Sequence, residues 1–348
     1  QSWDRQTRKT TEDMIAQGSG VVIQDGGYIL TNNHVIEEGS SFQILMPSGD
    51  KADATLVGAD SSTDLAVLKV TDEKLATDLV PVDLGSSKDL VVGETAIAIG
   101  NPGGEVLANT VTSGIVSALE REVDGDNTTR DIKYIQHDAP INSGNSGGGL
   151  FDVSGRLIGI NTLKYAGSQF SNVSFEGLGF AIPIDTAYPI AQALIKDGKV
   201  IRPQMGITVT DFTGPDEAMN NYPPASVVVY SVSNGSPAEK AGMMQYDFIT
   251  AVNGTRVNSL RELTSELDKY KAGDTVEVTV VRYSNPTQFV SSNQYAQNQD
   301  GSGNFNDYFG NFGGFGNNGG NNNNEQYNNT ANSYETLKLK VTLEILNN

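Results

Sequence analysis

Short apolar runs separated by turn residues dominate the chain from Gly18 to about Pro183. Many short strands at roughly 8–12-residue spacing, with few helical patterns, are typical of an all-β sandwich or barrel. We therefore expect a mainly β first domain. The runs predicted as strands are 20–23, 28–31, 42–45, 65–70, 95–99, 114–117 and 157–160.

A helical pattern follows this β-rich region between Thr186 and Asp197, and Gly198 is a suitable stop. Its apolar side chains recur on one side, and they belong to Ile190, Ala191, Leu194 and Ile195. The simplest interpretation is that residues 186–200 form a connector helix and linker between two domains.

The region from about residue 201 mixes predicted strands with two helices, which indicates a small α+β domain. Each helix starts with a capping box, Ser236 to Glu239 in the first and Ser259 to Glu262 in the second. Leucines and a tyrosine recur at helical spacing in the second helix. The predicted strands are 226–232, 248–252 and 275–282.

Residues 291–333 break the pattern, because 14 of these 43 residues are Asn and 8 are Gly. Such a segment buries too little apolar surface to offset the entropy of ordering, so we expect disorder. Residues 335–345 then alternate like a strand, which suggests a hairpin with strand 275–282 and an insertion at about 286–333. The insertion is either a passive spacer or a sticky segment that contacts substrates or neighbouring chains.

The composition excludes several classes of function. The 348 residues carry a net charge of −19, which disfavours binding to nucleic acid. There is no Cys and there are two His, so thiol nucleophiles and His-rich metal sites are excluded. The chain contains no run of 18 apolar residues, which is about the length that a membrane-spanning helix needs. The chain begins at Gln1 without an initiator Met, which indicates processing or trimming.

The sequence Gly144-Asn-Ser-Gly-Gly148 is the sharpest chemical signal in the chain. A serine becomes nucleophilic when a base takes its proton and nearby amides receive the developing oxyanion. Flanking glycines allow a tight turn whose amides point inward, with the donors drawn from Gly144, Asn145 and Ser146. Alternatively, the pentapeptide is an ordinary Gly/Ser/Asn loop.

Two distant residues favour the catalytic interpretation. His34 follows a buried-looking strand, and Asp64 precedes an apolar one. Each alone is more often structural, a packed histidine or a turn aspartate. Together, however, His34, Asp64 and Ser146 occur in the order used by chymotrypsin-type barrels, within a β-rich unit of fitting length.

Six motifs in order make the chain resemble an HtrA/DegP-type serine protease, over about residues 18–285 plus the last strand. The resemblance implies a chymotrypsin-like double β-barrel over 18–185, with His34 as general base, Asp64 orienting it and Ser146 as nucleophile. It further implies a homotrimer built through residues 1–17, where Trp3 is either an interface anchor or part of a frayed tail. The motifs are Thr31–Val35, Thr63–Val67, Gly100–Gly103, Thr112–Val116, Gly144–Gly148 and Gly179–Pro183.

Three positions depart from the family pattern. The family often has Thr at the place of His137, Pro or a basic residue at Ser143, and Pro or Ala at Gly149. His137 lies nine residues before Ser146 and has no Asp partner on a separate element, so we interpret it as structural or at the rim of the site. Gly149, which stands where the family often has Pro or Ala, would loosen the oxyanion loop.

Substrate preference and regulation follow in part from the resemblance. Pro140 stands six residues before Ser146, where trypsin-like enzymes carry an acid. The resemblance implies Ile141, Leu178 and Tyr165 as walls of an apolar pocket for small or medium aliphatic residues, although all three could be plain core residues. Arg121 matches an arginine that relays activation to the oxyanion hole, or is simply solvated. The sequence Asp124-Gly-Asp-Asn127 lacks EF-hand spacing, so we expect no metal.

Residues 201–348 resemble a PDZ domain that carries the insertion. Gln204-Met205-Gly206-Ile207 would form the carboxylate-binding loop, and the next strand would accept a peptide by β-augmentation. The family usually has Tyr-Leu in place of Gln204-Met205, which leaves ligand preference open. The alternative is that these residues merely lead into a strand.

The function expected from the resemblance is an ATP-independent serine endopeptidase without cofactor. It would degrade misfolded or damaged extracytoplasmic proteins, in the periplasm or at the cell surface, and its PDZ domain would bind peptide C-termini. A membrane anchor would lie only upstream of the given chain. The alternatives are a chaperone-like holdase with minor proteolysis and a regulatory protease with one dedicated substrate.

Overall fold

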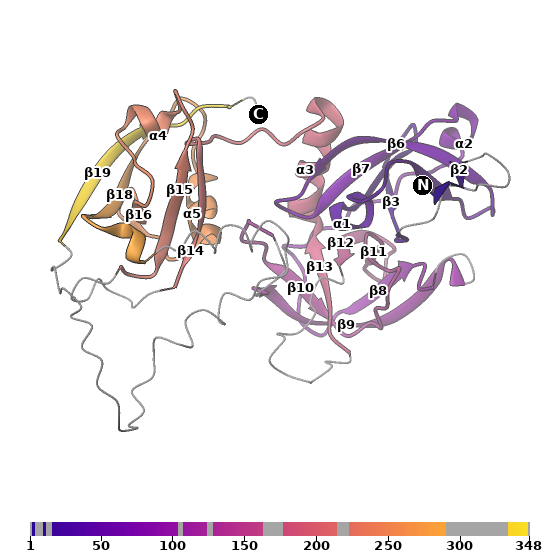
Figure 1. The fold of residues 1–348 in the computed structure, drawn as a ribbon. Helices are drawn as coiled ribbons and strands as arrows, with labels where there is room; N and C mark the ends of the chain where they lie inside the picture. The colour runs from indigo at the N-terminus through magenta and orange to yellow at the C-terminus, as the bar shows by residue number, and fades with distance from the viewer. Residues whose placement is uncertain are drawn as a thin grey trace, which may run out of the picture. The chain divides into compact units, whose positions relative to one another are not determined.

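Two antiparallel sheets, which contain all seven predicted strands and four more, form most of the regular structure described in residues 1–201 of the computed structural model (Figure 1). The structure describes residues 2–3, 10–11, 16–103, 107–123, 128–162, 177–213, 223–289 and 333–346. The first sheet has the order β3-β4-β7-β6-β5. Its strands are β3 (Val21–Gln24), β4 (Tyr28–Asn32), β5 (Phe42–Leu45), β6 (Lys51–Asp60) and β7 (Leu65–Val70). Three small elements accompany it: the pair β1 (Ser2–Trp3) and β2 (Thr10–Thr11), and the short helices α1 (Asn33–Ile36) and α2 (Glu73–Thr77).

The second sheet closes into a barrel with the order β10-β13-β12-β11-β8-β9. The mainly β class predicted from the strand spacing is confirmed, and hydrogen-bonded closure is found in this second sheet. Its strands are β8 (Thr95–Gly100), β9 (Thr110–Arg121), β10 (Tyr134–His137), β11 (Gly149–Phe151), β12 (Leu157–Thr162) and β13 (Gly179–Pro183).

One hydrophobic core joins the two sheets of this unit. Leu30 and Leu65 from the first sheet are fully buried in the same cluster as Leu157, Ile160 and Ile182 from the barrel. Because alternate residues of a strand face opposite sides, each sheet contributes a full apolar row to this core. The ends of β4 and the loops before β7 and β11 are therefore held in fixed positions.

The helix α3 (Ile184–Asp197) belongs to this core and is not a linker, which corrects the connector interpretation. Ala187, Ala191 and Leu194 are completely buried, and α3 lies against β6, β7 and β12 (Figure 1). The helix ends at Gly198 in the left-handed conformation, at a φ of 71°. The boundary between the two compact units falls between residues 201 and 202.

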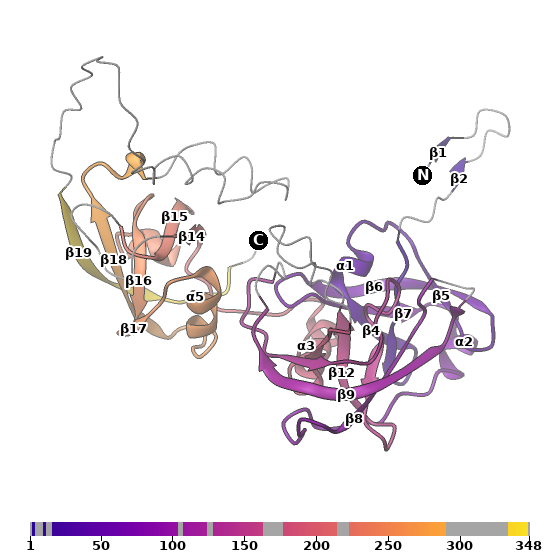
Figure 2. The same cartoon turned by 90° about the horizontal axis from the view of Figure 1, so that it is seen from below.

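The second unit is a sheet with the order β14-β15-β16-β18-β19, and β17 pairs with β16. The predicted N-caps are confirmed, since Ser236 and Ser259 each accept a hydrogen bond from the amide three residues on, at 3.2 Å, while Glu239 and Glu262 accept from the amide of the residue before each cap. The elements, several of them visible in Figure 2, are β14 (Ile207–Phe212), β15 (Ser226–Val232), α4 (Pro237–Lys240), β16 (Phe248–Val252), β17 (Thr255–Arg256), α5 (Leu260–Leu267), β18 (Thr275–Tyr283), a 3₁₀ turn (Pro286–Gln288) and β19 (Tyr334–Thr342).

The predicted hairpin between the last two strands is present. The strands β18 and β19 pair in antiparallel register from Thr275 opposite Thr342 to Tyr283 opposite Tyr334. The last strand ends three residues before its predicted end at Ile345. Residues 290–332, which contain nearly all of the Asn/Gly-rich segment, lie outside the described residues. No helix in the described ranges is both long enough and apolar enough to span a bilayer.

Candidate active site

The structure pairs His34 with Asp64. His34 lies in α1, directly after the buried strand β4, and Asp64 lies in the turn before β7. The His34 Nδ1 atom is 2.8 Å from Asp64 Oδ2, and the His34 backbone N–H donates to Asp64 Oδ1 at 3.0 Å. A carboxylate that accepts from Nδ1–H leaves Nε2 as the basic atom of the ring.

Several groups hold the Asp64 carboxylate in place. The residue is 2% exposed and takes the left-handed conformation, at a φ of 58°, which is unusual for a residue with a side chain. The Asn32 side-chain amide and the Asn33 backbone N–H donate to the Asp64 carbonyl at 3.0 and 3.1 Å. The Thr162 hydroxyl of β12 donates to Oδ2 at 3.4 Å. The Asp64 backbone is thus held from the first sheet, and its carboxylate is held from the barrel.

A cleft in the first unit brings Ser146 together with His34. It is lined by Ala16, Gln17, His34, Val35, Ser143, Gly144 and Ser146. In the described part of the chain, the Ser146 hydroxyl and the His34 ring form no hydrogen bond with each other. Catalytic hydrogen bonds are often longer in an enzyme without substrate. The structure therefore brings the three residues predicted for the triad to one site.

The oxyanion loop has two amides available and one that is engaged. The Asn145 N–H donates to the Asn142 carbonyl at 3.0 Å, so Asn145 is not a donor in this conformation, contrary to its inclusion among the expected donors. The Ser143 carbonyl accepts from the Gly103 N–H at 3.2 Å. Because a trans peptide is planar, the Gly144 N–H points to the opposite side from that carbonyl. Among the described residues, the amides of Gly144 and Ser146 have no hydrogen-bond acceptor.

His137 lies inside the barrel on β10, completely buried and opposite Gly179 of β13. A Cβ on Gly179 would collide with its imidazole ring. This position removes His137 from the cleft and agrees with a structural role. Burial away from water lowers the pKa of His137 from 6.5 to about 4.

This buried histidine predicts an acid-dependent loss of stability. Between pH 6.5 and about 4 the unfolded chain binds a proton that the folded chain does not. The free energy of unfolding therefore decreases as the pH is lowered across this range. Relative to His137→Thr, the wild type should lose about 2 kcal/mol more between roughly pH 7 and pH 5. Denaturant titrations of both proteins at both pH values measure the difference. Equal losses would show that His137 is not buried in its neutral form.

Of the predicted specificity residues, Ile141 and Leu178 are described, and neither is among the residues that line this cleft. Ile141 is partly buried against the barrel core, and Leu178 is 39% exposed. Tyr165 lies outside the described residues. Arg121 is exposed, and its Nε donates to the Gln136 side chain on β10 at 3.0 Å, so its guanidinium contacts the strand that carries His137.

The predicted carboxylate-binding loop of the second unit is held by backbone hydrogen bonds. Gly206 has a φ of 77°, and a Cβ there would press into Ser236. The Gln204 N–H donates to the Glu344 carbonyl at 2.8 Å, and the Met205 carbonyl accepts from the Ala238 N–H at 2.9 Å. In the described part of this unit, the backbone N–H groups of Met205 and Gly206 have no hydrogen-bond acceptor. The geometry suits the capture of a carboxylate by backbone amides.

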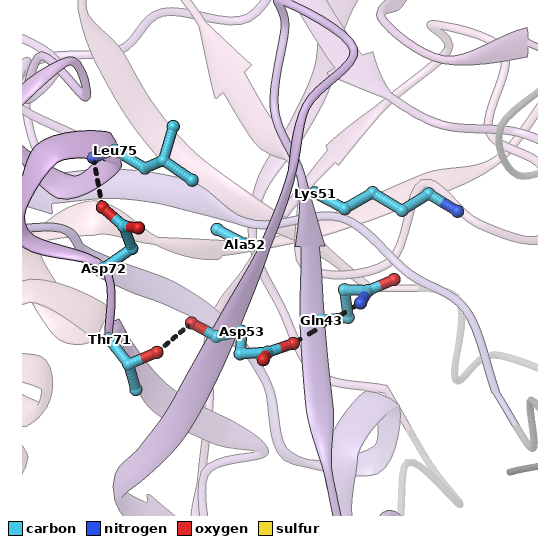
Figure 3. A pocket seen from close by; sticks show the side chains of 7 residues that line it. All are labelled: Gln43, Lys51, Ala52, Asp53, Thr71, Asp72 and Leu75. Carbon is cyan, nitrogen blue, oxygen red and sulfur yellow. Dashed lines mark hydrogen bonds between the residues drawn. The ribbon is translucent and has the colours of Figure 1, made fainter.

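A polar hollow on the first sheet does not form a second site. Figure 3 shows hydrogen bonds among its lining residues: Asp72 accepts from the Leu75 backbone N–H at 3.0 Å, and Asp53 accepts from the Gln43 side chain at 3.5 Å. It is lined by Gln43, Lys51, Ala52, Asp53, Thr71, Asp72 and Leu75. The described residues contain no cluster of three side chains suited to a metal ion. The segment 124–127 lies outside them.

Sequence reasoning missed three residues that support the site. Asn32 and Thr162 hold Asp64, and Ser19 bonds to the nucleophile loop 125 residues away, at Gly144. Asn32 and Thr162 flank strands recognised from their apolar pattern. Ser19 stands between two glycines, which was the one available signal of a close backbone approach.

Comparisons with known proteins agree with this geometry. Residues 18–160 match the trypsin-like peptidase domain, and residues 203–290 match the PDZ domain. The chain is 42% identical over 279 residues to a serine protease Do-like HtrA of Lactococcus lactis, covering 77% of this chain and 68% of the relative. It is also 42% identical over 268 residues to a probable periplasmic serine endoprotease DegP-like of Rhizobium meliloti, of which 51% is covered, with 77% of this chain.

A solved structure gives the same result for the fold. The HtrA-type protease AlgW with decapeptide superposes with a TM-score of 0.63 at 30% identity, covering 95% of this chain and 83% of that one. Both predicted domains thus have relatives of known architecture, in the predicted order along the chain. The chain therefore belongs to the HtrA family of trypsin-like serine endopeptidases that carry a PDZ domain.

Proposed function

We propose that the chain degrades misfolded or damaged proteins outside the cytoplasm, without ATP, and that peptide C-termini bound to its PDZ domain regulate it. The observation that carries the proposal is the bonded His34–Asp64 pair in one cleft with Ser146. An extracytoplasmic location is supported by relatives named as periplasmic. Peptide binding is supported by the related protease AlgW, which has been solved with a decapeptide and with a tripeptide.

In this mechanism His34 Nε2 takes the proton of Ser146 as its Oγ attacks the peptide carbonyl. The amides of Gly144 and Ser146 receive the oxyanion, and Asp64 stabilises the imidazolium that forms. His34 then gives the proton to the leaving amine, and an acyl-enzyme remains on Ser146. A water molecule, deprotonated by His34, hydrolyses this ester and restores the enzyme.

Cleavage of casein and labelling by a fluorophosphonate test the proposal, with Ser146→Ala beside the wild type. We expect both signals in the wild type and neither in the variant. If folded wild-type protein gives neither signal, the proposed nucleophile is wrong. If capture of unfolded casein survives in Ser146→Ala and the wild type cleaves almost nothing, the chain is a holdase instead.

Regulation by a chain end requires a separate comparison. Peptides with a free C-terminal carboxylate should stimulate cleavage, and amidated versions of the same peptides should not, because the Met205 and Gly206 amides need an anion. Equal stimulation by both would exclude capture of a chain end as the trigger. A homotrimer is part of the proposal, and analytical ultracentrifugation measures it.

A further inference from the structure

Ser19 connects four backbone or side-chain groups around the active-site loop. Its N–H donates to the Ser146 carbonyl at 2.8 Å, and its hydroxyl donates to the Gly144 carbonyl at 2.6 Å. The same hydroxyl accepts from the Asn101 N–H at 2.9 Å, and the Ser19 carbonyl accepts from the Thr31 hydroxyl at 2.7 Å. Every polar atom of this small residue is therefore engaged.

Three glycines let two segments, at Gly100 and at Gly147-Gly148, close tightly around Ser19. A Cβ on Gly148 would lie 3.2 Å from Ser19 Cβ, and one on Gly100 would lie 3.0 Å from Ser19 Oγ. A Cβ on Gly147 would collide with the Ser19 carbonyl. Since each approach needs a residue without a side chain, the surroundings fix the hydroxyl in one orientation.

This hydroxyl holds the peptide plane that follows Gly144, and so acts on one of the two planes that flank this residue. Gly144 has a φ of 103°, in the region open to glycine, so its backbone alone sets little preference. The Gly103 N–H holds the carbonyl of the preceding peptide, and Ser19 holds the carbonyl of the following one. With both planes pinned, the Gly144 N–H has one direction, and the Ser146 carbonyl is held by the same residue.

We infer that Ser19 is a positioning residue for the oxyanion hole, whose hydroxyl keeps the Gly144 amide aimed at the reacting oxygen. It touches no substrate and acts through Gly144. The inference rests on Ser146 being the nucleophile, as proposed above. Because an oxyanion forms only during reaction, loss of the hydroxyl lowers kcat and leaves KM nearly unchanged.

The variant Ser19→Ala tests this in the full-length chain. We expect kcat on a fluorogenic peptide to fall about 10- to 100-fold, somewhat less than the loss of a donor itself. The fluorophosphonate labelling rate should fall in parallel, with KM within about twofold. Ser48→Ala is the matched control, because the Ser48 hydroxyl also donates to an oxygen and accepts from an amide, but in an exposed turn. It should match the wild type.

A second variant separates positioning from folding. Ser19→Cys keeps the shape of the side chain but weakens both hydrogen bonds, so kcat should fall while the thermal midpoint stays close to that of the wild type. The inference is overturned if kcat in Ser19→Cys stays within threefold of the wild type. It is also overturned if kcat falls only in proportion to the fraction of protein that the fluorophosphonate can label to completion. Failure of the proposed function itself would appear earlier, as absence of labelling in the wild type.

Discussion

Replacement of Asp64 by Asn should lower kcat by about 10,000-fold and leave the fold intact. The Asp64 carboxylate accepts from His34 Nδ1 at 2.8 Å, which keeps the proton off Nε2. An Asn amide can instead donate to Nδ1, and the ring then carries its proton on Nε2. In that tautomer His34 cannot accept the Ser146 proton, and no carboxylate stabilises an imidazolium. Peptide hydrolysis by the purified variant measures the loss.

Asp60→Asn provides a matched control for this prediction. Asp60 is also buried, four residues earlier, but its Oδ2 accepts from the Thr63 hydroxyl at 2.6 Å and not from His34. Its kcat should remain within about tenfold of the wild type, since the tautomer of His34 is unaffected. If Asp64→Asn retains more than a tenth of wild-type kcat, Asp64 does not orient the base.

Replacement of Arg282 by Ala should destabilise the second unit by about 3–5 kcal/mol. Arg282 forms two bonds of 2.7 Å with the carboxylate of Asp247, which is completely buried, and a third of 2.9 Å with the Gly242 carbonyl. Removal of the guanidinium leaves a buried anion with no opposite charge. The pKa of Arg282 is raised, chiefly by its hydrogen bonds to Asp247, which reflects the same attraction. Hydrogen exchange of the β16 amides in the full chain reports the loss.

Lys338→Ala is the control for this ion pair. Lys338 bonds Glu277 at 2.6 Å on the adjoining strands β19 and β18, but its side chain is 66% exposed. An exposed pair contributes at most about 1 kcal/mol, so β16 exchange should barely change. If the two variants have equal effects, the burial of Asp247 does not increase the contribution of its ion pair with Arg282 to stability.

The active-site triad and most strands could be predicted because their signals are local. Short apolar runs between turn residues predicted β7 and β16 to the residue, and the order of His34, Asp64 and Ser146 indicated the site. The pairing of β18 with β19 was inferred because an alternating strand needs a partner. The family relationship is confirmed by the comparisons.

The contributions that could not be predicted depend on contacts between distant segments. Ser19 and Gly144 are 125 residues apart, and no periodicity connects them. The amphipathic pattern of α3 predicts that one face of the helix is buried, but it does not show which elements cover that face, so it does not distinguish a connector from a part of the core. Likewise, the sequence does not show that the Asn145 amide turns back to Asn142, because a peptide plane has no composition signal.

The β18–β19 hairpin has a consequence for how the gene can vary. About 50 residues separate the paired Tyr283 and Tyr334, yet the nine-residue register between the strands is complete. The entropy of closing a loop grows with the logarithm of its length, so a connection of about five residues would lower the free-energy cost of closure by only about 2 kcal/mol. Insertions and deletions in this connection therefore change the folding free energy only slightly. The connection is therefore free to drift in length among related proteins, while the two strands that it joins are not.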